Sequence, residues 1–202
     1  MVMMKTGSVL LLVLLTATSV SAKKKKGPPR RSGPAVVASG QIAAKSGAAL
    51  RGSLSVREIT GTDAHRYRLV VSVDHAPPGE HAVHIHEKGD CSAPDGRSAG
   101  AHWNPSNEAH GQWGHSHFHL GDIGNMKVGS DGKGSITIET DKWTPGSGLP
   151  SDPMGKAIIV HEKIDDFTTQ PTGNAGNRIG CGVIVSYQQE DTENPLAPTK
   201  NK

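Results

Sequence analysis

The sequence predicts an all-β fold, an antiparallel sandwich or flattened barrel of about eight short strands with two long functional loops. Three observations support this prediction. Short alternating or β-rich runs recur along the chain, turn signals rich in Gly, Pro and Asp separate most of them, and no segment has a convincing amphipathic helical period. Many short strands without helices are typical of sandwiches and barrels.

The expected strands follow one another along the chain, separated by turns. They are residues 35–43, 49–58, 67–73, 81–86, 126–128, 135–140, 157–160 and 182–187. Turns are indicated at residues 61–63, 77–79, 131–132 and 145–153. The two remaining segments, 88–125 and 161–180, are too polar for strands and are predicted to be loops. Loops of that length are usually functional or disordered, and the histidines in the first argue for function.

The first 22 residues have the pattern of a cleaved secretory signal. Lys5 precedes an apolar run from residue 9 to 15, and small residues end the segment at Ala22. The apolar run is much shorter than the roughly 20 residues that span a bilayer. We therefore expect an exported protein, periplasmic or extracellular.

Residues 23–34, KKKKGPPRRSGP, are predicted to be a flexible basic arm. The arm and Lys5 account for the basic pI of about 8.9, because the rest of the chain is net negative. Such an arm could contact an anionic envelope surface or polyanion, or act as a solubilising spacer. No specific nucleic-acid contact is predicted. Residues 189–202 have the composition of a polar C-terminal tail.

The chain has only two cysteines, Cys91 and Cys181. In an exported protein, this number indicates one disulfide. A closed loop of about 90 residues corresponds to a stabilisation on the order of 4 to 5 kcal/mol from chain entropy.

Nine of the eleven histidines lie between His75 and His119. His84 and His86 are two residues apart on an expected strand, so both side chains leave the same face. The first long loop adds His102, His110, His115, His117, His119 and Asp122. Imidazole with an occasional carboxylate suits zinc, and an all-imidazole set suits Cu(II).

A polyhistidine storage loop is the simpler alternative to a defined metal site. It would need neither an aspartate at fixed spacing nor a ligand from elsewhere in the chain. Asp122 stands three residues after His119, and His161 directly follows the apolar strand at 157–160. Both features favour a defined site.

Five motifs carry a specific resemblance to a known family. HIHEKGDC, SAGAHWNP, HFHLGDIGN, VHEKIDD and GNAGNRIGCGVI occur in the order and approximate spacing of the copper/zinc superoxide dismutases, over about residues 35–188. The resemblance implies an eight-stranded Greek-key sandwich. It also implies dismutation of superoxide to dioxygen and hydrogen peroxide, with one copper and one zinc per subunit. The position of Cys91 is similar to that in bacterial members, whereas HEKIDD and GNAGNR are more similar to eukaryotic members, so the resemblance does not specify a lineage.

The site residues implied by the resemblance fall into two metal sites and their surroundings. The copper ligands would be His84, His86, His102 and His161. The zinc ligands would be His102, His110, His119 and Asp122, with the His102 ring shared. Asp165 would hydrogen-bond His84 and His110, and Arg178 would dock the anion and act with His102 in catalysis. Cys91 and Cys181 match the family's disulfide.

Other functions are compatible with parts of the sequence. His115 and His117 are interpreted as exposed loop residues, with a peripheral metal site as the alternative. A copper- or zinc-sequestering envelope protein would use the same fold with little turnover. A polyanion-binding protein would depend on the basic arm. A homodimer is compatible with the sequence, which does not specify the oligomeric state.

Overall fold

The computed structural model describes residues 35–61 and 65–187. The predicted signal peptide (1–22), basic arm (23–34) and C-terminal tail (189–202) lie outside these ranges and stay predictions. In the described part of the chain, no helix is both long and apolar enough to cross a membrane.

Nine strands and one short 3₁₀ helix make up the described fold. The strands are β1 (Val36–Ala44), β2 (Arg51–Ile59), β3 (Arg66–Asp74), β4 (Gly79–His86), β5 (Asp122–Val128), β6 (Gly134–Thr140), β7 (Ala157–His161), β8 (Arg178–Val183) and β9 (Val185–Ser186), and the helix is η1 (Arg97–Ala99). The hydrogen-bonded order is β2-β3-β6-β5-β4-β7-β8-β1-β9, and the β1–β2 pairing closes the barrel. All of these strand pairs are antiparallel, which confirms the predicted fold class.

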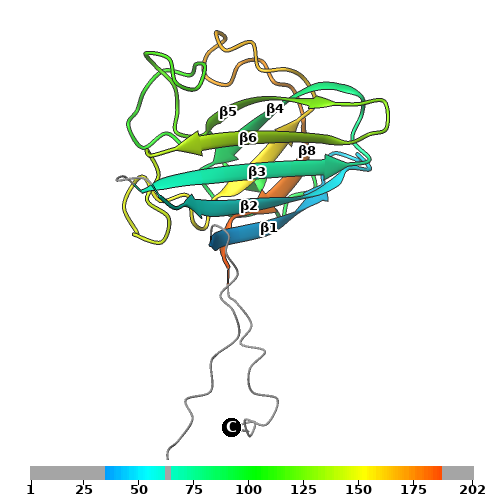
Figure 1. Cartoon of the computed structure of the whole chain (residues 1–202). Coiled ribbons are helices and arrows are strands. Elements are labelled where there is room, and N and C mark those ends of the chain that lie inside the picture. Colours follow the sequence, from blue (N-terminus) through cyan, green and yellow to red (C-terminus); the bar gives the residue numbers. More distant parts are fainter. Residues whose placement is uncertain (1–34, 62–64, 188–202) are drawn as a thin grey trace, which may run out of the picture. The chain divides into compact units, whose positions relative to one another are not determined.

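The barrel is flattened into two layers (Figure 1). Strands β1, β2, β3 and β6 form one layer, and β5, β4, β7 and β8 form the other. In the first layer, β3 alternates buried residues such as Leu69 and Val71 with more exposed ones, because only one face of a half-buried strand meets the core. In the second layer, β7 is buried at every position and β4 from His81 to His86. Two-sided burial requires that the long loops cover the outer face of this layer.

Two strands begin four residues earlier than the sequence predicted. β5 starts at Asp122 rather than at residue 126, and β8 starts at Arg178 rather than at 182. Their polar first residues join the sheet because their backbones pair with neighbouring strands: Asp122 with His84 and Arg178 with His161. The expected strand 182–187 is split into the end of β8 and the short β9.

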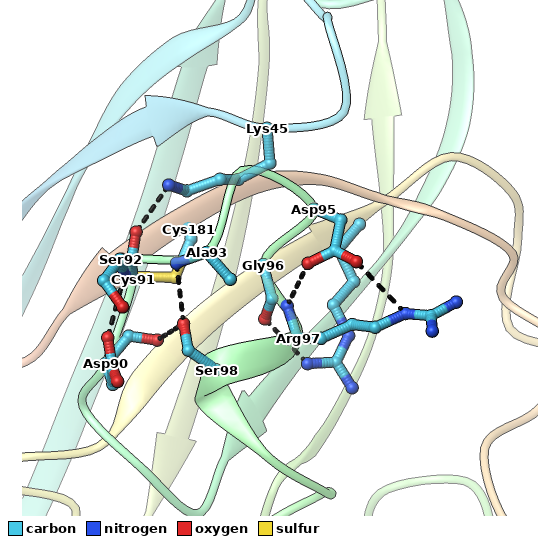
Figure 2. The surroundings of a disulfide bond; sticks show 11 residues. Lys45, Asp90, Cys91, Ser92, Ala93, Asp95, Gly96, Arg97, Ser98 and Cys181 are labelled. Atoms are coloured by element: carbon cyan, nitrogen blue, oxygen red, sulfur yellow. Dashed lines mark hydrogen bonds and ion pairs between the residues drawn. A yellow bond between two sulfur atoms is a disulfide. The ribbon is translucent and has the colours of Figure 1, made fainter.

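A disulfide joins Cys91 of the first long loop (87–121) to Cys181 of β8, with a Cα–Cα distance of 5.7 Å (Figure 2). The surrounding loop is tied by further bonds. Lys45 Nζ donates to the carbonyl of Cys91, and Ser98 Oγ donates to the carbonyl of Asp90 at 2.8 Å. The disulfide thus fixes the start of the loop against the barrel.

We predict that the double substitution Cys91→Ala, Cys181→Ala lowers the free energy of unfolding by about 2–5 kcal/mol, because the bond closes a loop with a sequence separation of 90. Denaturant titration of both proteins measures the difference. Adding reductant should destabilise the wild type and leave the double variant unchanged. A double variant as stable as the wild type would contradict the prediction.

Candidate metal centre

The centre is built on the outer face of the second layer. His84 and His86 leave the same face of β4, and His161 is the last residue of β7, the strand paired with it. His102, from the first long loop, forms an isolated bridge with His86. Strand pairing and one loop contact therefore bring together residues that are far apart in the sequence.

A closed set of three backbone hydrogen bonds holds the loop on β4. Ile85 N donates to Gly121 O (2.8 Å), Gly121 N donates to Trp103 O (3.0 Å), and Trp103 N donates to Ile85 O (2.8 Å). A Cβ atom at Gly121 would lie 2.2 Å from Ile85 O, so this close approach requires glycine. These three hydrogen bonds bring together His84, His102 and Asp122, which adjoin Ile85, Trp103 and Gly121 in the sequence.

Four buried imidazoles form the first cluster, those of His84, His86, His102 and His161, with one ring nitrogen of each within 4.8 Å of the others. His84 Nδ1 and the Nε2 atoms of the other three are buried without a hydrogen-bond partner. Each such atom costs free energy unless something binds it. Four unpartnered nitrogens in one place fit a metal ion, and an all-imidazole set suits Cu(II).

The second cluster shares His102 with the first and adds His110, His119 and Asp122. Asp122 Oδ1 lies 2.9 Å from His102 Nδ1 and 3.1 Å from His119 Nδ1, and Oδ2 lies 3.0 Å from His110 Nδ1. All four side chains are buried. Three imidazoles and one carboxylate are a zinc-type set of donors.

The second nitrogen of several rings is held by an acceptor. His86 Nδ1 lies 2.9 Å from Gly100 O, His161 Nδ1 3.3 Å from Gly176 O, and His119 Nε2 3.1 Å from Glu108 O. A ring that donates from one nitrogen to a carbonyl presents the lone pair of the other. These contacts therefore orient the ligating nitrogens toward the two clusters.

Asp165 connects the two clusters. Its Oδ2 lies 2.9 Å from His84 Nε2 and its Oδ1 lies 2.8 Å from His110 Nε2, with all three side chains fully buried. The structure thus brings together the three residues that the resemblance linked. Gly173 adjoins this carboxylate, and a Cβ atom there would lie 1.8 Å from Asp165 Oδ1. Any larger residue at 173 would displace Asp165.

Burial and charge set the protonation of these rings before metal binds. Burial lowers the pKa of His86 and of His161 well below the ordinary value, and neighbouring imidazoles add to the effect. Burial also lowers the pKa of His102 to about 4, against the opposing influence of Asp122. Neutral imidazole is the form that binds metal.

His110 behaves differently from these rings. Burial would lower its pKa, but the carboxylates of Asp122 and Asp165 outweigh burial and raise the pKa to about 9. Burial would likewise raise the pKa of Asp122, and its three histidine partners instead hold it far below the usual range. In the metal-free protein, a proton on His110 must therefore leave before Nδ1 can bind a metal.

Arg178 lies beside the first cluster, with its backbone paired with that of His161. Its Nη1 donates to Gly96 O (2.8 Å), and its Nη2 donates to Gly100 O (2.7 Å), the carbonyl that also faces His86 Nδ1. A hollow of about 380 Å³ opens beside it, lined by Ser46, Asp95, Arg97, Gly100, Gly176, Asn177 and Arg178. A permanently charged, half-buried guanidinium in such a hollow can bind a small anion.

His115 and His117 lie outside both clusters. Both are exposed, and His117 Nδ1 lies 2.8 Å from Glu108 Oε2. No group of three or more potential metal ligands in the described residues includes either of them.

Three positioning residues were missed by sequence reasoning. Asn125 exchanges two hydrogen bonds with the backbone of Asp165, and Gln170 exchanges two with the backbone of His110. The ring of His81 lies between the carbonyls of His161 and Pro77. Because all three act through backbone atoms of distant residues, no local sequence pattern would have identified them.

Comparison with known proteins identifies the family. A family model for copper/zinc superoxide dismutase (SODC) matches residues 50–184. The chain belongs to the copper/zinc superoxide dismutase family. Superoxide dismutase [Cu-Zn] 3 of Arabidopsis thaliana is 39% identical over 152 residues, covering 71% of this chain and 88% of that protein.

Two further relatives of the chain have names that describe them only as similar to dismutases. Superoxide dismutase-like protein YojM of Bacillus subtilis is 37% identical over 137 residues, or 66% of this chain and 70% of that protein. The crystal structure of a SOD-like protein from Bacillus subtilis matches with a TM-score of 0.63 and 33% identity, covering 74% of this chain and 99% of that one. These matches identify the family and the fold of the chain.

We predict that Asp165 stabilises the metal-free protein at neutral pH. Burial would raise its pKa, but hydrogen bonds from His110 and His84 outweigh burial and lower the pKa to about 2. A carboxyl whose pKa is lowered in the folded state stabilises the fold at every pH above its pKa in the unfolded chain, which is about 4. This contribution is lost as the pH falls toward 2. The contribution is about 2 kcal/mol.

Urea unfolding of metal-free wild type and Asp165→Asn between pH 7 and pH 2 tests this prediction. The stability difference should shrink as the pH falls below about 4. Asp141→Asn, at an exposed position, is the control and should follow the wild type. A difference that is constant with pH would show that the carboxylate charge is not responsible.

Proposed function

We propose that this family member is an exported copper/zinc superoxide dismutase with one copper in the first cluster and one zinc in the second. The observation that carries the proposal is the pair of complete four-ligand clusters that share one imidazole, His102. When bound, copper supplies the one-electron chemistry that converts two superoxide ions and two protons to dioxygen and hydrogen peroxide. Side chains of the protein would transfer the proton and bind the substrate.

His102 is suited to move a proton between the two half-reactions. Its Nδ1 is held beside Asp122 in the second cluster, while its Nε2 faces the first cluster without a partner. A proton can therefore be carried on Nε2 in one half-reaction and donated to the peroxide product in the other. Because Nδ1 stays in place, the ring keeps its orientation through the cycle.

Arg178 is suited to dock superoxide. Both terminal nitrogens of its guanidinium are fixed by backbone carbonyls, so the side chain needs no reordering when an anion arrives. Sharing Gly100 O with His86 keeps the docking group close to a ligand of the first cluster. A protein that only stored metal would need neither this arginine nor the shared imidazole, which favours dismutation over sequestration.

Superoxide decay measured by stopped flow tests the proposal. The protein from residue 23 onward, reconstituted with one copper and one zinc, is compared with the variants His161→Ala and His117→Ala. His117→Ala is the control, because His117 is exposed and lies outside both clusters. We expect rapid decay for wild type and His117→Ala, and loss of activity for His161→Ala. Slow decay by the wild type despite full copper occupancy would support the sequestering function instead.

We predict that Arg178→Gln lowers the second-order rate constant for superoxide by on the order of tenfold to a hundredfold, because the variant loses the fixed cation beside the first cluster. Copper content and the visible spectrum of the bound copper should change little, since Arg178 is not a ligand. The loss should diminish as salt is added, because screening weakens the attraction that the substitution removes. A rate equal to the wild type at low salt would assign Arg178 a structural role only.

A further inference from the structure

All three tryptophans of the chain lie in one stack. Trp103 directly follows His102, and Trp113 stands between His110 and His119 in the first long loop. Trp143 comes from a different part of the fold, the loop of residues 141–156 that follows β6. The stack thus joins the loop that carries most second-cluster ligands to a segment that carries none.

The contacts of the stack have the geometry of favourable aromatic pairs. The centroid of Trp143 lies 5.9 Å from that of Trp113, in an edge-on arrangement of 78°, and 6.2 Å from that of Trp103. Phe118, from the same loop, lies 5.1 Å from Trp113. Tilted and edge-on aromatic pairs at such distances stabilise beyond the area that they bury.

The middle ring of the stack, that of Trp143, is embedded in the barrel. Trp143 is 1% exposed and belongs to the main hydrophobic core. Trp103 donates its indole N–H to Pro150 O at 3.2 Å, and Lys156 Nζ lies 5.2 Å from its ring centroid. The loop 141–156 therefore holds Trp103 from two sides, and Trp143 provides a fixed core surface against which Trp113 packs.

A second observation separates this stack from ordinary core packing. Trp143 Nε1 is buried with no hydrogen-bond partner. An unpartnered N–H is costly, and an aliphatic side chain would fill a core position without that cost. The large face of an indole at this position is explained by its contacts with the rings of Trp103 and Trp113.

The second cluster depends on a loop without strands and with only one turn of 3₁₀ helix. Ordering such a segment costs conformational entropy, and a metal that had to order it on binding would bind more weakly by that amount. An anchor between His110 and His119 reduces the cost, because the ligand-bearing segment is already held against the barrel.

We propose that the stack of Trp103, Trp113 and Trp143 is an aromatic anchor that orders the second-cluster loop before metal binds and thereby raises its affinity for zinc. Trp113 is the positioning residue of this anchor, since it is partly buried and lies within the loop itself. The inference rests on the zinc site of the proposed function.

Zinc affinity of the full, metal-free chain tests the anchor, with Zn²⁺ alone titrated against a competing chelator. We expect Trp113→Ala to weaken Zn²⁺ binding by about tenfold. Trp113→Phe should recover most of the affinity, because it keeps an aromatic ring. Tyr187→Ala, which removes a half-exposed aromatic ring from another part of the surface, should bind as the wild type does.

The outcomes distinguish the anchor from the site. Wild-type affinity in Trp113→Ala would overturn the anchor and leave the zinc site intact. Failure of the wild type to bind Zn²⁺ would instead count against the proposed function. Equal weakening by Trp113→Ala and Trp113→Phe would also overturn the anchor, since a ring at residue 113 would then make no difference.

Tryptophan emission of the wild type provides a test without any substitution, because the stack contains every tryptophan of the chain. If the anchor forms before metal binds, acrylamide should quench the emission weakly in the metal-free protein, with little change when Zn²⁺ is added. Strong quenching that falls several-fold on adding Zn²⁺ would show that the metal orders the stack, and would overturn the proposal even if Trp113→Ala fails to fold.

Discussion

The structure depends on holding buried imidazole nitrogens close together without hydrogen-bond partners. Four such atoms lie in the first cluster, on His84, His86, His102 and His161. Each disfavours the metal-free fold, so the scaffold must supply compensating stability. The closed barrel does this. Its second layer is buried on both faces, and the histidines leave β4 and β7 at positions where the backbone is already fixed by sheet hydrogen bonds.

The long loops are stabilised differently from the barrel. They have too few apolar residues for a core of their own and instead use polar contacts with precise geometry. Asp165 bridges His84 and His110. Asn125 holds the backbone of Asp165, and Gln170 holds the backbone of His110. Glycine at 121 and 173 allows close approaches that a Cβ atom would prevent. Arg178 also belongs to this network, because Gly100 O accepts from its guanidinium and faces His86 Nδ1. The proposed docking group and one of the proposed metal ligands are therefore parts of one arrangement.

Family membership and activity rest on different observations. The match over residues 50–184 shows the family, yet one relative of the chain is named only as superoxide dismutase-like. The proposed activity rests on the completeness of the site. In this chain, both four-ligand clusters, the shared ring and the fixed guanidinium are present together. The tryptophan anchor extends this reasoning from the ligands to the loop that presents them.

The sequence by itself determined the fold class, the approximate strands and the candidate ligands, because alternation, turn residues and ordered motifs are local or nearly local signals. It could also pair Cys91 with Cys181, since no other cysteine exists. The tertiary structure alone decided that β5 and β8 begin at Asp122 and Arg178. A strand prediction based on apolar residues did not include these positions, because their side chains are polar. It alone revealed the clamps by Asn125 and Gln170 and the stack around Trp143. These contacts join residues that are distant in the chain through backbone atoms and ring faces. The local sequence around either partner therefore does not predict the contact.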